Sequence, residues 1–277
     1  MRNVLLVFAG VAMVARAAAQ APPAPSATAA IVEQAGKYVT GYLEAFSAVV
    51  SEEKQTQRLI RYDGRVSKVR DITADFLLVK TGTTWPQAYR DVIEVDGKRI
   101  RNREDRLKKL FLEHPKNAAA LAGAIAEESG RYNIGIGRRG NSPLVPVVFL
   151  TPDIASGVRF EGTESALTFQ EIRTPTVLRR RSGAGDHNMP AHGTFEIEPG
   201  TGRVLSVEFT ADNPDSRFSA SYKVRYAIDP KLEISVPVEL TERYWRPDAP
   251  GADVLEVRST YSSFRRFDVT TTEQIKK

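Results

Sequence analysis

The 277-residue sequence contains no cysteine and only three histidines. Without cysteine the chain has no disulfide bond, no cysteine-linked lipid anchor and no thiolate metal ligand. With so few histidines, candidates for a metal centre or a general base are scarce, and we expect no metal and no cofactor. The fold must be held by its own core, for which this length is sufficient.

Long apolar runs are almost as scarce. The longest is Val4–Val14, which follows Met1-Arg2-Asn3 and precedes the small residues Ala17–Ala19. It is too short for a membrane helix, which needs about 20 residues, but it has the layout of a signal peptide. We therefore predict a signal peptide over 1–19, a Pro/Ala tether over 20–30 and one domain over 31–277. That domain has no transmembrane span and is periplasmic or secreted.

The net charge of the chain does not by itself indicate a function. The formal net charge is +5 and 26% of the residues are charged, which is ordinary for a globular protein. An exported chain with this balance gives no reason to expect nucleic acid as a partner.

What the sequence does have is a strong alternation of apolar and polar residues. Every second residue from Phe218 to Ile228 is apolar, and shorter alternations recur around Phe195, Leu205, Val236 and Leu255. Successive strand side chains point to opposite faces, so these segments predict an antiparallel sheet with one apolar face. We expect that face to line a concavity for a hydrophobic ligand with these residues: Phe218, Tyr222, Val224, Tyr226, Val238 and Leu240.

Other patterns add helices and turns around this sheet. Apolar residues from Ile31 to Phe46 recur at helical spacing, and a helical pair is expected within Arg103–Ser129 as a lid. Asp63-Gly64 and Asp96-Gly97 are typical of tight hairpin turns. Short strands are expected at 145–150, 158–162, 167–172 and 176–181, a loop at 182–190, and a strand with polar faces around 51–58.

The fold class that follows is α+β and mostly β. We predict a curved antiparallel sheet, a half-barrel, with an N-terminal helix and the inserted helical pair.

A basic cluster is the most suggestive polar feature. Its cations, beside the apolar Leu107, Leu110 and Phe111, indicate a site for an anionic surface or acidic partner, or else the charged outer face of a packed helix. The cluster consists of Lys98, Arg99, Arg101, Arg103, Arg106, Lys108 and Lys109.

Catalytic motifs are weak, and no catalytic residue can be named. The string Gly135–Gly140 resembles a dinucleotide fingerprint, but Pro143 lies where its helix would have to run, so we expect a surface loop. His187 and His192 lack acidic neighbours beyond Asp186 to complete a metal shell, so an exposed polar loop is expected there.

The order of elements resembles the outer-membrane lipoprotein carrier (LolA/LolB-like) architecture. The resemblance involves the helix around Tyr38–Phe46, the insertion Arg103–Ser129 and the segment Thr260–Phe267. It implies a curved sheet and helices around an apolar cavity for acyl chains. The segments Tyr89–Gly97 and Thr260–Phe267 are also similar to an uncharacterised family of exported bacterial proteins, which implies no activity.

Three functions are therefore open. The leading hypothesis is an exported binding or carrier-type protein for a lipid or other hydrophobic small molecule. The alternative is a non-enzymatic envelope interaction or structural module, whose apolar face is filled by the helices and whose basic patches dock an envelope protein. A hydrolase using carboxylates or the histidines is the weakest of the three, and we lean against enzymatic activity.

Overall fold

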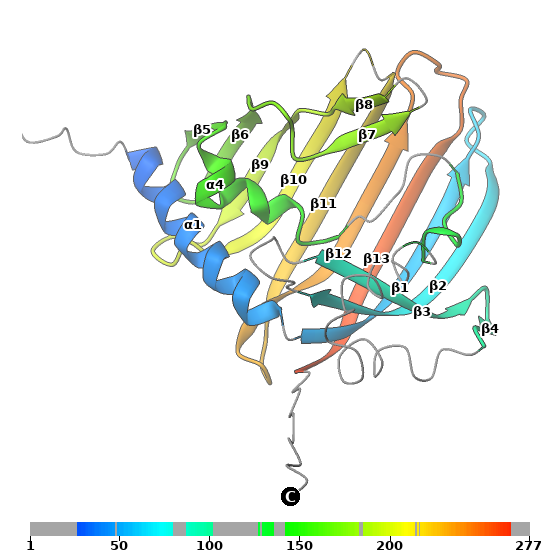
Figure 1. Ribbon diagram of the computed structural model, residues 1–277, viewed down its shortest axis with the longest axis horizontal. Coiled ribbons are helices and arrows are strands. Elements are labelled where there is room, and N and C mark those ends of the chain that lie inside the picture. Colours follow the sequence, from blue (N-terminus) through cyan, green and yellow to red (C-terminus); the bar gives the residue numbers. More distant parts are fainter. Residues whose placement is uncertain are drawn as a thin grey trace, which may run out of the picture.

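A computed structural model describes residues 27–47, 49–79, 87–101, 127, 129–135, 142–182, 185–213, 215 and 217–266. Within these residues the chain is mostly strand, with one long helix and two short ones (Figure 1). In chain order the elements are α1 (Ala27–Phe46), β1 (Val49–Ile60), β2 (Val66–Val79), β3 (Gln87–Val95), β4 (Lys98–Arg99), the 3-10 helix η3 (Pro146–Leu150), α4 (Pro152–Ala155), β5 (Val158–Gly162), β6 (Ala166–Glu171), β7 (Arg179–Ser182), β8 (Gly185–Asn188), β9 (Ala191–Ile197), β10 (Val204–Asn213), β11 (Phe218–Asp229), β12 (Ile234–Trp245) and β13 (Val254–Arg266).

Eleven of the strands form one large, curved antiparallel sheet that does not close into a barrel. The strand order is β4-β3-β2-β1-β13-β12-β11-β10-β9-β6-β5. The predicted fold class, a curved antiparallel sheet with an N-terminal helix, is thus confirmed. The sequence did not reveal that the last strand, β13, lies in the middle of the sheet, between β12 and the first strand β1.

The two faces of the sheet differ. Helix α1 crosses one face, here called the inner face, together with η3 and α4 (Figure 1). The hairpin β7–β8, a separate two-stranded sheet, lies on the same side. The opposite, outer face carries the polar residues of the alternation.

Helix α1 begins at Ala27, before the apolar stripe starts, because alanine is the strongest helix former. Its buried residues include Ala35, Val39, Tyr42 and Phe46, which is the predicted stripe. Gly36 allows a close approach, because a Cβ built there would lie 2.7 Å from the carbonyl oxygen of Leu150 in η3.

The two predicted hairpin turns differ in width. Asp96 and Gly97 both have positive φ, and Val95 pairs directly with Lys98, as in a tight two-residue turn. At Asp63-Gly64 the turn is wider, because the N–H of Arg61 donates to the carbonyl of Arg65 at 2.9 Å.

Two local predictions were wrong. Residues 146–150 form a 3-10 helix instead of a strand, because a short apolar run does not distinguish the two by periodicity, and Pro146 suits a helix start. The expected loop over 182–190 contains strand β8, whose Asp186 pairs with Arg181 of β7.

Several predictions fall outside the described residues. These are the signal peptide, most of the tether, almost all of the helical pair in 103–129, and the loop after Gly135. Among the residues that are described, no helix has the length and apolar character needed to cross a membrane.

Candidate functional site

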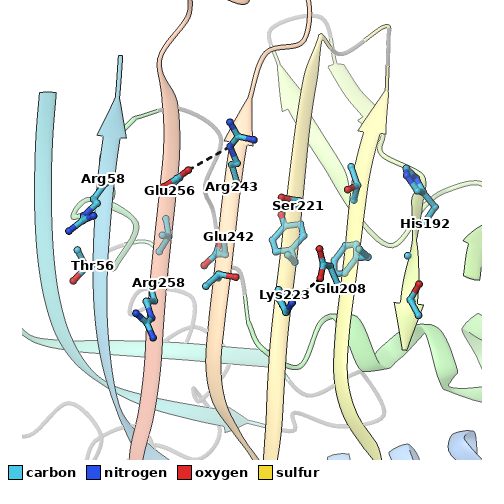
Figure 2. Close-up of a pocket in the computed structure, with 17 residues that line it drawn as sticks. Thr56, Arg58, His192, Glu208, Ser221, Lys223, Glu242, Arg243, Glu256 and Arg258 are labelled. Atoms are coloured by element: carbon cyan, nitrogen blue, oxygen red, sulfur yellow. Dashed lines mark ion pairs between the residues drawn. The ribbon is translucent and has the colours of Figure 1, made fainter. Parts of the chain in front are cut away.

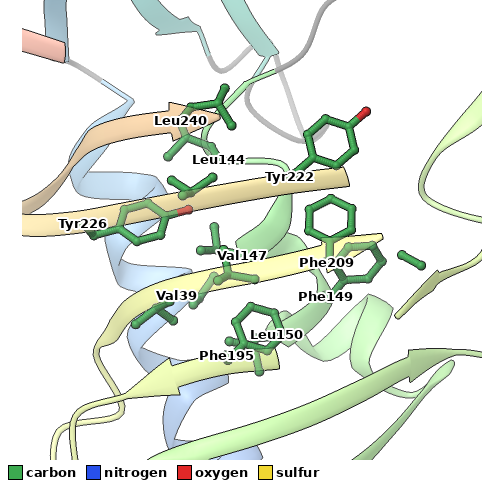
Figure 3. Close-up of a cluster of buried hydrophobic side chains, with 14 of the residues drawn as sticks. Val39, Leu144, Val147, Phe149, Leu150, Phe195, Phe209, Tyr222, Tyr226 and Leu240 are labelled. Atoms are coloured by element: carbon green, nitrogen blue, oxygen red, sulfur yellow. The ribbon is translucent and has the colours of Figure 1, made fainter. Parts of the chain in front are cut away.

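The inner face beneath α1 is filled by the protein's own side chains (Figure 3). Phe149 of η3 packs on Phe169 and Phe209, with ring centroids 5.0 and 5.8 Å away, and Phe169 packs on Phe195 at 4.9 Å. Val39 of α1 is fully buried in the same core. This part of the face is therefore a packed core rather than a cavity.

The predicted lining residues belong to this core. Val224 and Leu240 are fully buried, and Val238 is partly buried against the same cluster. Tyr222 stacks on Phe209 with ring centroids 4.7 Å apart. Their role in ligand binding stays a prediction.

Tyr226 and Phe218 lie at opposite ends of β11. The ring of Tyr226 meets that of Tyr42 edge-on at 6.2 Å, and its hydroxyl donates to the carbonyl of Pro143. Burial raises the pKa of the Tyr226 hydroxyl well above its usual value. The Arg180 guanidinium of β7 lies 4.5 Å above the ring of Phe218, so this end is covered by the hairpin.

An apolar groove lies beside α1, outside the filled core. It has a volume of about 700 Å³ and runs along one side of α1 from Thr28 to Thr40, with η3, α4 and β5 as its other walls. At 1.5 Å per helical residue this is roughly 18 Å of length. Its apolar lining is Ala29, Val32, Gly36, Leu150, Pro152, Ala155 and Phe160.

A polar rim borders this groove. Lys37 donates to Glu33 at 2.6 Å, and both side chains are largely exposed. The lysine side chain and its hydrogen bond lower the pKa of the Glu33 carboxyl. The groove thus joins an apolar floor to a charged edge, as in sites for amphipathic ligands.

A second, smaller apolar space lies at the end of the inner face. Its volume is about 300 Å³, at the lower limit for small-molecule sites. Phe218 is the one predicted lining residue in it. The other apolar side chains are Leu59, Tyr244, Trp245, Ala252 and Leu255.

The inner face of β1 carries a buried hydrogen-bond network. Glu53 accepts hydrogen bonds from Arg90, with Nη2 3.0 Å from Oε1, and from the Tyr261 hydroxyl at 2.8 Å. Burial, and next the Glu53 carboxylate, raise the pKa of Tyr261 well above its usual value. Gln57 Nε2 donates to Gln55 Oε1 at 2.7 Å, and Gln57 Oε1 accepts from the N–H of Ile134 at 2.8 Å.

Glu53, Gln55 and Gln57 are hydrogen-bonded within the protein, as buried polar groups require, whereas the Ser51 hydroxyl has no hydrogen-bond partner within the described residues. No set of three or more His, Cys, Asp or Glu side chains suited to a metal ion is found in the part of the chain that the structure describes. The alternation that buries these groups, Ser51, Glu53, Gln55 and Gln57, is visible in the sequence. What the sequence does not show is that this polar side faces inward.

The predicted basic cluster is only partly described. Lys98 and Arg99 form the edge strand β4, and with Arg101 they are exposed. Exposed cations on an edge strand oppose pairing with another sheet. Arg103, Arg106, Lys108 and Lys109 lie outside the described residues, so the anionic-partner site stays a prediction.

His187 and His192 lie in strands and not in the loop that the sequence predicted. His187 lies in β8 and pairs with Arg180, whereas His192 lies in β9 and pairs with Thr210. Strand formation therefore corrects the expectation of an exposed polar loop.

Comparisons with known proteins give only distant likenesses. No protein-family model and no curated protein matches the sequence. Among solved structures, a DUF1329 family protein from Desulfovibrio piger has a TM-score of 0.29 at 10% identity, covering 87% of this chain and 95% of that one. A structure titled for lipid–protein interactions in lipovitellin has a TM-score of 0.28 at 9% identity, covering 81% of this chain and 26% of that one. At these TM-scores neither likeness bears on the ligand of this chain.

Proposed function

We propose that this protein is an exported, periplasmic or secreted binding protein for a lipid or other hydrophobic molecule, and that the apolar part of the ligand lies in the groove between α1 and α4. The observation that carries the proposal is the groove itself, about 700 Å³ with Val32, Leu150 and Phe160 among its walls. Apolar surface in contact with water is unfavourable, and a buried ligand would remove it.

The dimensions and chemistry of the groove suit an acyl chain. A groove of roughly 18 Å accommodates an extended chain lying along α1. Each CH₂ group taken out of water contributes about 0.8 kcal/mol to binding. The charged rim at Glu33 and Lys37 would leave a polar headgroup in contact with solvent.

Titration with a fluorescent fatty acid, cis-parinaric acid, tests this proposal. The wild-type protein is expected to bind it saturably. Val32→Glu places a charge on a half-buried groove position and should raise the Kd by at least about tenfold, a change of about 1.4 kcal/mol. Val69→Glu, at a site 48% exposed on β2, makes the same chemical change away from the groove and should bind like the wild type.

A third variant shows which of the two apolar spaces binds the ligand. Ala252→Arg fills the 300 Å³ pocket beside Phe218 and leaves the α1 groove intact. Loss of binding in Ala252→Arg, with normal binding in Val32→Glu, would refute the groove and move the site to the end of the inner face.

The interaction-module alternative also has an observation in its favour, because the inner face under α1 is filled by phenylalanine rings. In that alternative the apolar groove holds no small ligand. Absence of saturable fatty-acid binding by the wild-type protein would favour it over the proposal.

A further inference from the structure

A second groove lies on the outer face of the sheet, away from α1 and the apolar groove (Figure 2). It has a volume of about 860 Å³ and crosses six neighbouring strands, β1, β13, β12, β11, β10 and β9. Neighbouring strands lie about 4.8 Å apart, so the groove is roughly 24 Å long. It runs across the strands, not along them.

Strand pairing organises its walls into two rows. The first row, read across the six strands by direct pairing, is Arg58, Glu256, Arg243, Ser221, Thr210 and His192. The second row is Thr56, Arg258, Thr241, Lys223, Glu208 and Thr194. All twelve side chains line the groove, and each is polar.

The rows carry an excess of positive charge. They hold four cations against two carboxylates, since Glu256 and Glu208 are the only acids in either row. Lys223 lies 3.1 Å from Glu208, and Arg243 lies 3.7 Å from Glu256. Glu242 also borders the groove, but it is only 2% exposed and accepts the Tyr244 hydrogen bond within the sheet.

The carboxylates of the two rows do not neutralise two of the cations, which lie at one end of the groove. The Arg58 side chain is exposed and makes neither a hydrogen bond nor an ion pair with the described residues. Arg258 pairs at 2.8 Å with Glu239, but Glu239 lies outside the rows and is shared with Arg225 at 3.1 Å. An anionic ligand that reaches Arg58, Arg258 and Arg243 would therefore meet net positive charge.

We infer that this outer groove binds a linear polysaccharide that carries carboxylate groups. Arginines would pair with the carboxylates, while the threonine and serine hydroxyls and Glu208 would bond the sugar hydroxyls. A pyranose unit is about as long as the spacing between strands, so a chain lying across the strands would place about one sugar unit at each strand along a row.

Other occupants fit the rows less well. Neither row contains phenylalanine, tyrosine or tryptophan, so single-stranded nucleic acid finds no series of aromatic rings on which to stack. An acyl chain finds no apolar side chain in either row. A peptide strand would pair at a sheet edge, and this groove lies in the middle of the sheet.

Fluorescence anisotropy with labelled oligogalacturonate, long enough to cross six strands, tests the inference. We expect saturable binding that weakens as salt rises, and no binding of maltooligosaccharide of equal length. The double variant Arg58→Ser/Arg258→Ser should raise the Kd at least about tenfold, because two charge-assisted contacts are lost.

A matched control distinguishes binding in the groove from unspecific attraction of the anionic ligand to positive charge. Lys54→Ser/Arg159→Ser removes two cations from the same face outside the groove, and neither contacts Glu239, so its Kd should stay within about threefold of the wild type. Equal losses in both double variants would overturn the inference. So would equal binding of the neutral and the acidic oligosaccharide by the wild-type protein. Unchanged far-ultraviolet circular dichroism would show that the variants fold.

Discussion

Two halves of the inner face use the same strand geometry with opposite chemistry. Under α1, strands β9–β12 present aromatic rings, of which Phe209 packs on Phe149 of η3 and Phe195 packs on Phe169 of β6. On β1 the inward positions are Ser51, Glu53, Gln55 and Gln57, all buried. The first half is stabilised by removing apolar surface from water, and the second by hydrogen bonds that replace those made to water.

The two halves therefore differ in how they tolerate change. In the apolar half a lost side chain leaves a cavity, and the cost grows with the volume removed. In the polar half one lost partner leaves a buried donor or acceptor unsatisfied, whereas loss of both partners together is nearly neutral. This difference can be measured in single and double variants.

The largest effect is expected from Phe209→Ala in the apolar half. Phe209 is 2% exposed, and its ring lies 4.7 Å from Tyr222 and 5.8 Å from Phe149. The substitution should lower the free energy of unfolding by about 3–5 kcal/mol in urea titrations. Ile172→Ala, at a site 57% exposed, should change it by less than about 0.5 kcal/mol. A loss below about 1 kcal/mol at Phe209 would mean that the space there is not tightly filled.

The polar half is tested by Arg90→Met. Arg90 is 8% exposed and donates to Glu53, which is 1% exposed, so the variant leaves a carboxylate buried without its cation. We expect a loss of about 3 kcal/mol in the free energy of unfolding at neutral pH.

The double variant Arg90→Met/Glu53→Met is the control for Arg90→Met. It removes both charges but leaves the Tyr261 hydroxyl without its acceptor, so it should recover only part of the lost stability. A double variant that is less stable than Arg90→Met would show that the pair contributes more than mutual neutralisation.

The apolar half could be predicted from the sequence, and the polar half could not. Alternation from Phe218 to Ile228 fixes one apolar face, and the structure buries Phe218, Tyr222, Val224 and Tyr226 on it. Glu53 and Gln57 alternate equally well, but polar residues usually mark the solvent side. Their burial depends on partners far along the chain, such as Tyr261 and Asn133, which no local pattern reveals.

The candidate sites were harder still to predict. The apolar groove needs α1, α4 and β5 to meet, and Val32 and Phe160 lie 128 positions apart in the sequence. The outer groove depends on β1 pairing with β13, since this pairing places Arg58 opposite Glu256. Loop closure and long-range pairing of this kind leave no periodic signal in the sequence.

The smallest effect is expected from a buried carboxyl in the apolar half. Glu171 of β6 is 3% exposed and accepts the N–H groups of Val177 at 2.7 Å and Ala191 at 3.2 Å. Burial nevertheless raises the pKa of Glu171, more than these hydrogen bonds and Arg173 lower it. Because the folded pKa lies above the unfolded value, the protonated form is favoured on folding. Its contribution to stability is therefore fully present below the unfolded pKa and is lost as the pH rises through the folded pKa.

Urea titrations of the wild type and Glu171→Gln between about pH 4 and pH 8 measure this contribution. Glutamine does not titrate here and keeps only one acceptor oxygen for the two N–H groups, so the variant carries a constant offset. The stability of the wild type relative to the variant should decline as the pH rises through this window. An increase with pH would instead mean that the hydrogen bonds from the backbone N–H groups outweigh the effect of burial and hold the pKa of Glu171 below its usual value. Glu171 would then resemble a member of the polar network more than an isolated acid among phenylalanines.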